Sequence, residues 1–266
     1  MEHSFYIITW PDIFVSLVLV AFCIGLIKWW RVGLESSILI GTVRTFVQLS
    51  VMGYVLTWFF AQDHWLFMVG LIAVMILIAS FEGYRRQEVK VPGYFLIVMF
   101  SMAITVVLIL GTIMGFILDV KPWYSPYAMI PIAGMIIGNG LNSLSLTTNR
   151  LMSELHHREE EIELFLSLGA PPKAAVEESM KESVKAALIP NINALMMVGL
   201  VQIPGVMTGQ ILAGIDPLIA VKYQIMIMYM WITTSTLATV LTQLLVIRKF
   251  FTPHQQLRRE MLRISD

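Results

Sequence analysis

Long apolar stretches alternate with short polar connections along almost the whole chain. Seven of these stretches come near the roughly twenty residues that a helix needs to cross a bilayer. A transmembrane β-barrel would instead show alternating segments of about ten residues. The pattern therefore predicts an all-α polytopic membrane protein, a single transmembrane domain over 1–266 with about seven transmembrane helices. The predicted spans are 11–28, 35–59, 65–81, 92–118, 126–149, 187–212 and 218–247.

The stretch 153–189 interrupts this apolar pattern. It contains eight Glu and four basic residues. Gly169 ends a helix-like segment and Pro171 with Pro172 opens the next, which are common stop and start signals. We therefore predict a cytoplasmic helical hairpin that docks a partner, with a solvated loop as the alternative. Helically spaced apolar residues on both sides of the turn favour docking; they are Leu155, Ile162, Phe165 and Leu166, then Val176, Met180 and Val184.

Composition and charge agree with the membrane class and give it a direction. Hydrophobic residues make up 57% of the chain and charged residues only 14%, whereas soluble domains have about 25% charged residues. Fifteen Lys and Arg fall in one set of connections and two in the alternate set. Basic loops stay in the cytoplasm, so the hairpin and a basic tail at 248–266 are predicted to be cytoplasmic. The N-terminus is then outside, in a protein of the cell inner membrane.

Two absences limit the chemistry of the chain. A single Cys, Cys23, excludes an intramolecular disulfide and a cysteine-based metal site. No nucleotide-binding loop of the GxxxxGK[ST] type is present. We therefore expect no enzyme activity and no cofactor in this chain, and its energy source has to lie elsewhere.

A charged residue, Arg44, lies about nine residues into the second predicted span. A charge at that depth costs about 3 kcal/mol on insertion scales, so the side chain should face protein or water. Arg44 is either part of a substrate path, with Gln48 one turn further on, or a structural partner of a carboxylate or of helix carbonyls. Glu82 is a possible carboxylate partner.

Amides gather in the fifth and sixth predicted spans. Asn139 and Asn142 are three residues apart and share a helix face. They could line a polar path or hold helices together. Gln202 and Gln210 flank Pro204, which is predicted to kink the sixth helix. That kink is either a moving element or a passive bend.

The hairpin carries a recognisable motif. The segment 161–170 resembles the Glu…Leu-Gly-Ala part of the coupling motif of ABC transporter permeases, and 188–190 resembles its closing Ile-x-Leu-Pro. The segments 138–142, 202–214, 216–217 and 223–230 are similar to the Fet-type permeases. That family comprises bacterial iron exporters and plant relatives tied to aluminium tolerance. The resemblance covers nearly the whole chain and is strongest from Pro131 onward.

The resemblance implies a permease subunit of an ATP-driven exporter that exports iron and supports metal and oxidative stress resistance. It also implies a permease homodimer in the lipid bilayer with separate ABC ATP-binding subunits, which would hold ATP and Mg and hydrolyse the ATP. No nucleic acid partner is expected. The coupling residues that the resemblance implies are Glu161, Glu163, Leu164, Phe165, Leu168, Gly169, Ala170 and Pro171.

The transported species stays open at this point. Cation paths are normally lined by carboxylates, and the sequence places none firmly mid-membrane. Iron that crosses with a chelating anion would suit Arg44 better. The resemblance to the plant relatives also implies a nucleotide sugar or another anionic solute as the alternative cargo. A non-transporting scaffold that recruits a cytoplasmic partner is a further alternative. The missing carboxylates count against an ion-gradient carrier. Our path candidates are Arg44, Gln48, Asn139, Asn142, Gln202 and Gln210, and no set of metal ligands is identified.

Overall fold

The computed structural model of the chain describes residues 9–61, 64–87 and 91–261. Helices make up most of these residues, and the described part contains no β-strand beyond two isolated bridges. The prediction of an all-α membrane protein is therefore confirmed. Six helices of the described part are long and apolar enough to cross a membrane, one fewer than the seven predicted spans. The chain divides into two compact units, and each is described by itself.

The first unit is built from α1 (Trp10–Trp29) and α2 (Glu35–Phe60). Thr9 and Asp12 form a capping box at the start of α1, which satisfies backbone N–H groups that have no partner within the helix. The two helices contact each other, and the rings of Trp10 and Phe46 meet edge to face at 6.1 Å. Neither helix buries a residue.

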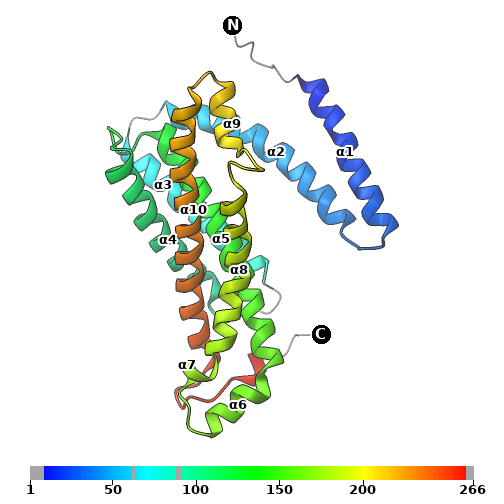
Figure 1. The fold of residues 1–266 in the computed structure, drawn as a ribbon, viewed down its shortest axis with the longest axis vertical. Helices are drawn as coiled ribbons and strands as arrows, with labels where there is room; N and C mark the ends of the chain where they lie inside the picture. The colour runs from blue at the N-terminus through cyan, green and yellow to red at the C-terminus, as the bar shows by residue number, and fades with distance from the viewer. Residues whose placement is uncertain (1–8, 62–63, 88–90, 262–266) are drawn as a thin grey trace. The chain divides into compact units, whose positions relative to one another are not determined.

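The second unit is a helical bundle. It contains α3 (Trp65–Arg85), α4 (Tyr94–Thr112), α5 (Pro126–His157), α8 (Glu177–Met197) and α10 (Pro217–Ile247). A π-helical turn, Ile113–Ile117, continues α4. Within the bundle α5 packs against all four of the others, and α10 packs against α4, α5 and α8 (Figure 1). The core therefore lies around α5 and α10.

Close packing of the core depends on Gly140 of α5. A Cβ atom at this position would lie 3.1 Å from Met102 Sδ of α4 and 3.5 Å from Ala238 Cβ of α10. Because glycine has no Cβ, three helices can approach each other at this level. The neighbouring turns of α5 bury Ile136 and Leu144 completely.

The sixth predicted span, 187–212, is broken. Helix α8 ends at Met197, and α9 (Gly205–Leu212) begins only after a turn at 198–204. Gly199 adopts φ +81° and donates its N–H to the Gln202 carbonyl at 3.0 Å, a left-handed conformation that glycine adopts easily. This corrects the expected kink at Pro204. Pro204 directly precedes α9, and its carbonyl accepts from Thr208 N at 2.9 Å, so it begins a helix instead of bending one.

The predicted hairpin has different helix boundaries from those expected. Helix α5 continues to His157, α6 (Glu159–Ser167) and α7 (Pro172–Ala175) follow, and α8 already begins at Glu177. The second hairpin helix and the first half of the sixth predicted span are therefore one helix. Figure 1 shows α6 and α7 at the end of the bundle opposite α9. The 3-10 turns η2 (Arg248–Phe250) and η3 (Arg259–Met261) complete the described chain.

Candidate functional site

The turn between α6 and α7 has a defined geometry. Gly169 adopts φ +87°. Its N–H bonds the Leu166 carbonyl at 3.0 Å, and the Ala170 N–H bonds the Phe165 carbonyl at 2.9 Å. This pair of bonds is the Schellman motif, in which a left-handed residue closes a helix. Pro171 is extended and Pro172 opens α7, so the reversal of the chain is held by the backbone itself.

Three apolar side chains of this turn are exposed. Leu164 is 60% exposed, Phe165 43% and Leu168 75%. We call these three residues the apolar tip. They lie outside the six helices that are candidates to cross the membrane, so the tip is an apolar surface beside the bundle. Exposed apolar patches of this kind mark interaction sites.

The predicted apolar stripes only partly contribute to this surface. Leu155, Ile162 and Val176 are buried within the chain's own fold, whereas Phe165 stays exposed. Helical spacing identifies an apolar face, but it cannot tell which protein covers that face. The buried stripe residues therefore belong to the chain's own core, and the candidate docking residues are those of the apolar tip.

The acidic side of α6 is occupied by ion pairs within the chain. Glu161 receives two hydrogen bonds from Arg158, at 2.8 and 2.9 Å. Glu163 accepts from both Nε and Nη2 of Arg259, and Arg259 Nε also lies 3.2 Å from Glu159 Oε1. The hydrogen bond from Arg259 is the main cause that lowers the pKa of the Glu163 carboxyl. The C-terminal segment is thus tied to the hairpin.

Replacing Arg259 should release this segment. Arg259→Ala is expected to reduce the hydrogen-exchange protection of residues 252–258 about fivefold, because an exposed ion pair contributes about 1 kcal/mol. Arg258→Ala is the matched control, since Arg258, unlike Arg259, forms no ion pair with a carboxylate whose side chain the structure describes. Equal effects of the two changes would contradict the role of Arg259.

Acid should have the same effect as this substitution. Because the pKa of the Glu163 carboxyl is lowered, its ion pair with Arg259 contributes its full stabilisation at any pH above the usual carboxyl pKa range. The contact is lost as the pH falls through the lowered value. Protection of residues 252–258 should therefore hold from pH 7 to about pH 5 and be lost only in stronger acid.

A second candidate site lies inside the bundle, where polar side chains of three helices meet. We call it the polar seam. Its members come from α5, α8 and α10 and are Asn139, Ser143, Thr147, Asn191, Trp231, Ser235 and Thr239.

Asn191 and Asn139 connect these helices. The Asn191 amide donates to Ser143 Oγ at 3.2 Å and to Ser235 Oγ at 3.0 Å, and its carbonyl accepts from Trp231 Nε1 at 2.8 Å. The Asn139 amide donates to Ser235 Oγ at 2.9 Å and to the Trp231 carbonyl at 3.0 Å. Hydrogen bonds between helices stabilise membrane proteins by about 0.6 kcal/mol each. In this conformation the amides hold helices together.

The sequence contains a pattern that predicts the polar seam. Our prediction that Asn139 and Asn142 share one helix face did not use this pattern. Polar residues recur every fourth position on both central helices, and such residues share one face. The helices α5 and α10 bring these two rows against each other, as the 3.3 Å contact between the Thr147 and Thr239 hydroxyls shows. The rows are Asn139, Ser143 and Thr147, and Trp231, Ser235, Thr239 and Gln243.

The four path candidates of the second unit, Asn139, Asn142, Gln202 and Gln210, do not share one site. Only Asn139 belongs to the polar seam. Asn142 accepts a hydrogen bond from Arg86 Nη1 at 2.9 Å, and Gln202 lies on the turn between α8 and α9. Gln210 lies on α9. Arg44 and Gln48 are exposed on α2, in the other unit, so their predicted role stays a prediction.

A cavity of about 420 Å³ adjoins the break between α8 and α9. Gly199 and Pro204 line it from the break, and Gln224 and Met228 line it from α10. Gln224 is only 6% exposed, and its Oε1 has no hydrogen-bond partner in the described chain. Irregular backbone at membrane depth is tolerated against protein or a watery cavity. The cavity and the unpaired amide oxygen are therefore consistent with a hydrated region.

The described residues contain no group of three His, Cys, Asp or Glu side chains that could hold a metal ion. The polar seam offers amide, hydroxyl and indole groups. Such groups can bind a solute by hydrogen bonds, but they are not a typical cage for a hard cation.

Comparison with known proteins identifies the family. The model of the family described as "Uncharacterised protein family (UPF0014)" matches residues 10–251. A UPF0014 membrane protein of Synechocystis is 38% identical over 97% of this chain and 99% of its own. The probable iron export permease protein FetB of Escherichia coli is 36% identical over 94% of this chain and 95% of its own. No solved structure matches.

A plant relative extends the same comparison. The protein ALUMINUM SENSITIVE 3 of Arabidopsis thaliana is 32% identical over 91% of this chain and 88% of its own. The resemblance to the Fet-type permeases, stated from the motifs above, is therefore confirmed. With nearly its full length matched, the chain belongs to the UPF0014 family of membrane proteins.

Proposed function

We propose that the chain is the permease subunit of an ATP-driven exporter, with iron as the exported species. A separate ABC ATP-binding subunit, holding ATP and Mg²⁺, docks on the apolar tip and drives the cycle. The hairpin and the C-terminal segment face the cytoplasm, and the N-terminus lies outside the cell inner membrane. The chain itself hydrolyses nothing.

The observation that supports this proposal best is the apolar tip. Leu164, Phe165 and Leu168 are exposed to 60%, 43% and 75% on a turn fixed by Gly169. A solvated loop does not need three exposed apolar side chains on a rigid turn, whereas a docking element does. The relative named as an iron export permease supports the choice of substrate.

The first unit supports assembly as a permease homodimer. Within their own unit α1 and α2 bury no residue, so both apolar helices need a cover of lipid or of further helices, which a second copy could supply. Two copies would also give two apolar tips, one for each ATP-binding subunit. Alternating access would follow from rearrangement of helices around the polar seam.

Export of an anionic solute, such as a nucleotide sugar or an anionic iron complex, is the second candidate. The composition of the polar seam favours it, because the seam contains amides, hydroxyls and an indole but no carboxylate. The Asn139 and Asn191 amides donate within the seam in this conformation, so a rearrangement of the seam would have to present these donors to an anion or a neutral polar solute.

Substrate-stimulated ATP hydrolysis tests the proposal. The chain is reconstituted in liposomes with its ATP-binding subunit and titrated with free iron, with chelated iron and with nucleotide sugars. Stimulation by one class identifies the cargo. Assembly of a stable complex with stimulation by none of them would contradict transport of these solutes, and failure of any ATP-binding subunit to assemble would contradict the permease role itself.

A further inference from the structure

A cavity of about 720 Å³ lies at the basic end of the bundle, where α10 ends. Its apolar part includes Leu244 and Ile247, in the last turn of α10, and Phe251 just beyond η2. Since the candidate membrane span runs to Phe250, the cavity sits at the edge of the apolar part of the bundle. A ligand in this cavity would contact apolar and polar side chains at the same time.

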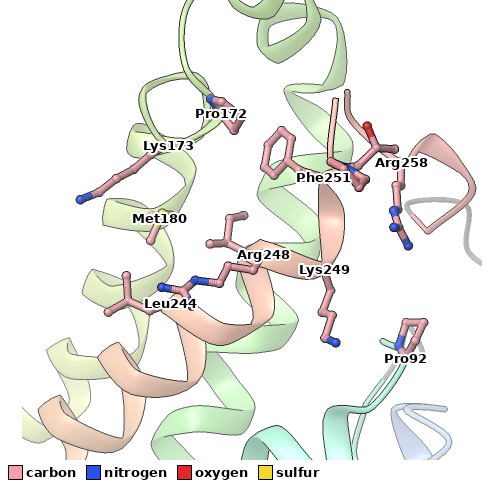
Figure 2. A pocket seen from close by; sticks show the side chains of 12 residues that line it. Pro92, Pro172, Lys173, Met180, Leu244, Arg248, Lys249, Phe251 and Arg258 are labelled. Carbon is pink, nitrogen blue, oxygen red and sulfur yellow. The ribbon is translucent and has the colours of Figure 1, made fainter. Parts of the chain in front are cut away.

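The polar part of this cavity is basic. Four cationic side chains from three segments line it, and no acidic residue does. Figure 2 shows Lys249, from η2, and Arg258, from the C-terminal segment, extending toward Pro92, while Arg248 reaches toward Leu244. The fourth cation, Lys173, extends away from the others in this view.

These cations differ from the other basic residues at this end. Among the carboxylates whose side chains the structure describes, none lies within ion-pair distance of the four. In contrast, Glu residues pair with Arg150, Arg158, Lys181, Lys185 and Arg259. A cluster of unpaired positive charges around a cavity repels itself, and an anion bound in the cavity would remove that cost.

We propose that this cavity binds a phosphate group, that of an anionic phospholipid headgroup at the predicted cytoplasmic surface. Lys249 and Arg258 contact the phosphate, since ammonium and guanidinium groups are the usual phosphate donors. Leu244, Ile247 and Phe251 contact the glycerol and the start of the acyl chains. Basic pockets between membrane helices on the cytoplasmic side bind lipid headgroups in the same manner. This inference is independent of the transported solute.

Native mass spectrometry of the full chain in detergent tests the inference. Phosphatidylglycerol and phosphatidylcholine are titrated separately, and retained lipid is counted. We expect the wild type to retain phosphatidylglycerol preferentially, and Lys249→Gln with Arg258→Gln to weaken its binding at least tenfold. Lys181→Gln with Lys185→Gln is the matched control. It removes the same charge from α8 at residues that do not line the cavity, and it should leave the preference unchanged.

A competition arm separates the two sources of phosphate. If inorganic phosphate at millimolar concentration displaces the lipid, the site takes a soluble phosphate; if only phosphatidylglycerol is retained, the ligand is the lipid. Either result supports a phosphate site. Equal weakening in both double variants, or no preference over phosphatidylcholine and no competition, would overturn it, because either would mean general charge attraction.

Discussion

Leu168→Glu is expected to abolish co-purification of the ATP-binding subunit while the permease stays folded. Leu168 is 75% exposed, so the substitution removes nothing from the chain's own core. Burying a Leu side chain in an interface contributes about 2 kcal/mol to the binding free energy. The substitution loses this contribution, and burying an unpaired carboxylate in its place weakens binding further. Affinity should therefore fall at least a hundredfold, as measured by pull-down of the tagged permease from detergent extract.

Two controls separate surface contact from turn geometry and from charge. Gly169→Asn keeps a residue that tolerates the left-handed conformation, and should retain the partner, whereas the β-branched Gly169→Val should lose it. His156→Glu adds the same charge on an exposed position of α5 and should bind normally. Normal co-purification with Leu168→Glu would rule out docking on the apolar tip.

Asn191→Leu should destabilise the membrane bundle, and by more than Asn139→Leu. Asn191 makes three hydrogen bonds to other helices, with Ser143, Ser235 and Trp231. At about 0.6 kcal/mol each, their loss amounts to about 2 kcal/mol, and the Trp231 indole N–H loses its acceptor as well. A fall of about 5 °C in Tm is expected for a chain of this size.

Asn193→Leu provides the matched control. Asn193 lies on the same helix, is exposed, and makes no side-chain hydrogen bond within the described chain. The same substitution there should leave Tm almost unchanged in a fluorescence-detected thermal unfolding assay. Comparable losses for both variants would show that the loss of Tm does not depend on the seam, and would refute its structural role.

The sequence was sufficient for the fold class and for the position of the turn at Gly169. Uninterrupted apolar runs identify helices that must satisfy their backbone internally in lipid, which is why α3, α4 and α10 lie close to their predicted spans. Gly169 and Pro172 stop and start helices by local sterics alone. Local rules such as these need no knowledge of the neighbouring helices.

The boundaries and the sites were less predictable. Hydropathy is averaged over a window of residues, so the predicted span 187–212 ran across the turn at Gly199 that separates α8 from α9. The same prediction divided the continuous helix α8 between the hairpin and this span. The helical spacing correctly placed Ile162 on an apolar face of α6. The chain's own fold, and not a partner protein, buries that residue. Periodicity gives a face of a helix, and the partner of that face depends on the packing of other helices.

By itself, the sequence determined an all-helical membrane protein with a sharp turn at Gly169, because apolar length and glycine conformation act locally. Only the tertiary structure decided that Leu164, Phe165 and Leu168 remain exposed while Leu155 and Ile162 do not. It also brought Asn139, Asn191 and Ser235 together from three helices. Such groupings depend on which faces of distant segments meet, and that is set by the packing of the whole bundle.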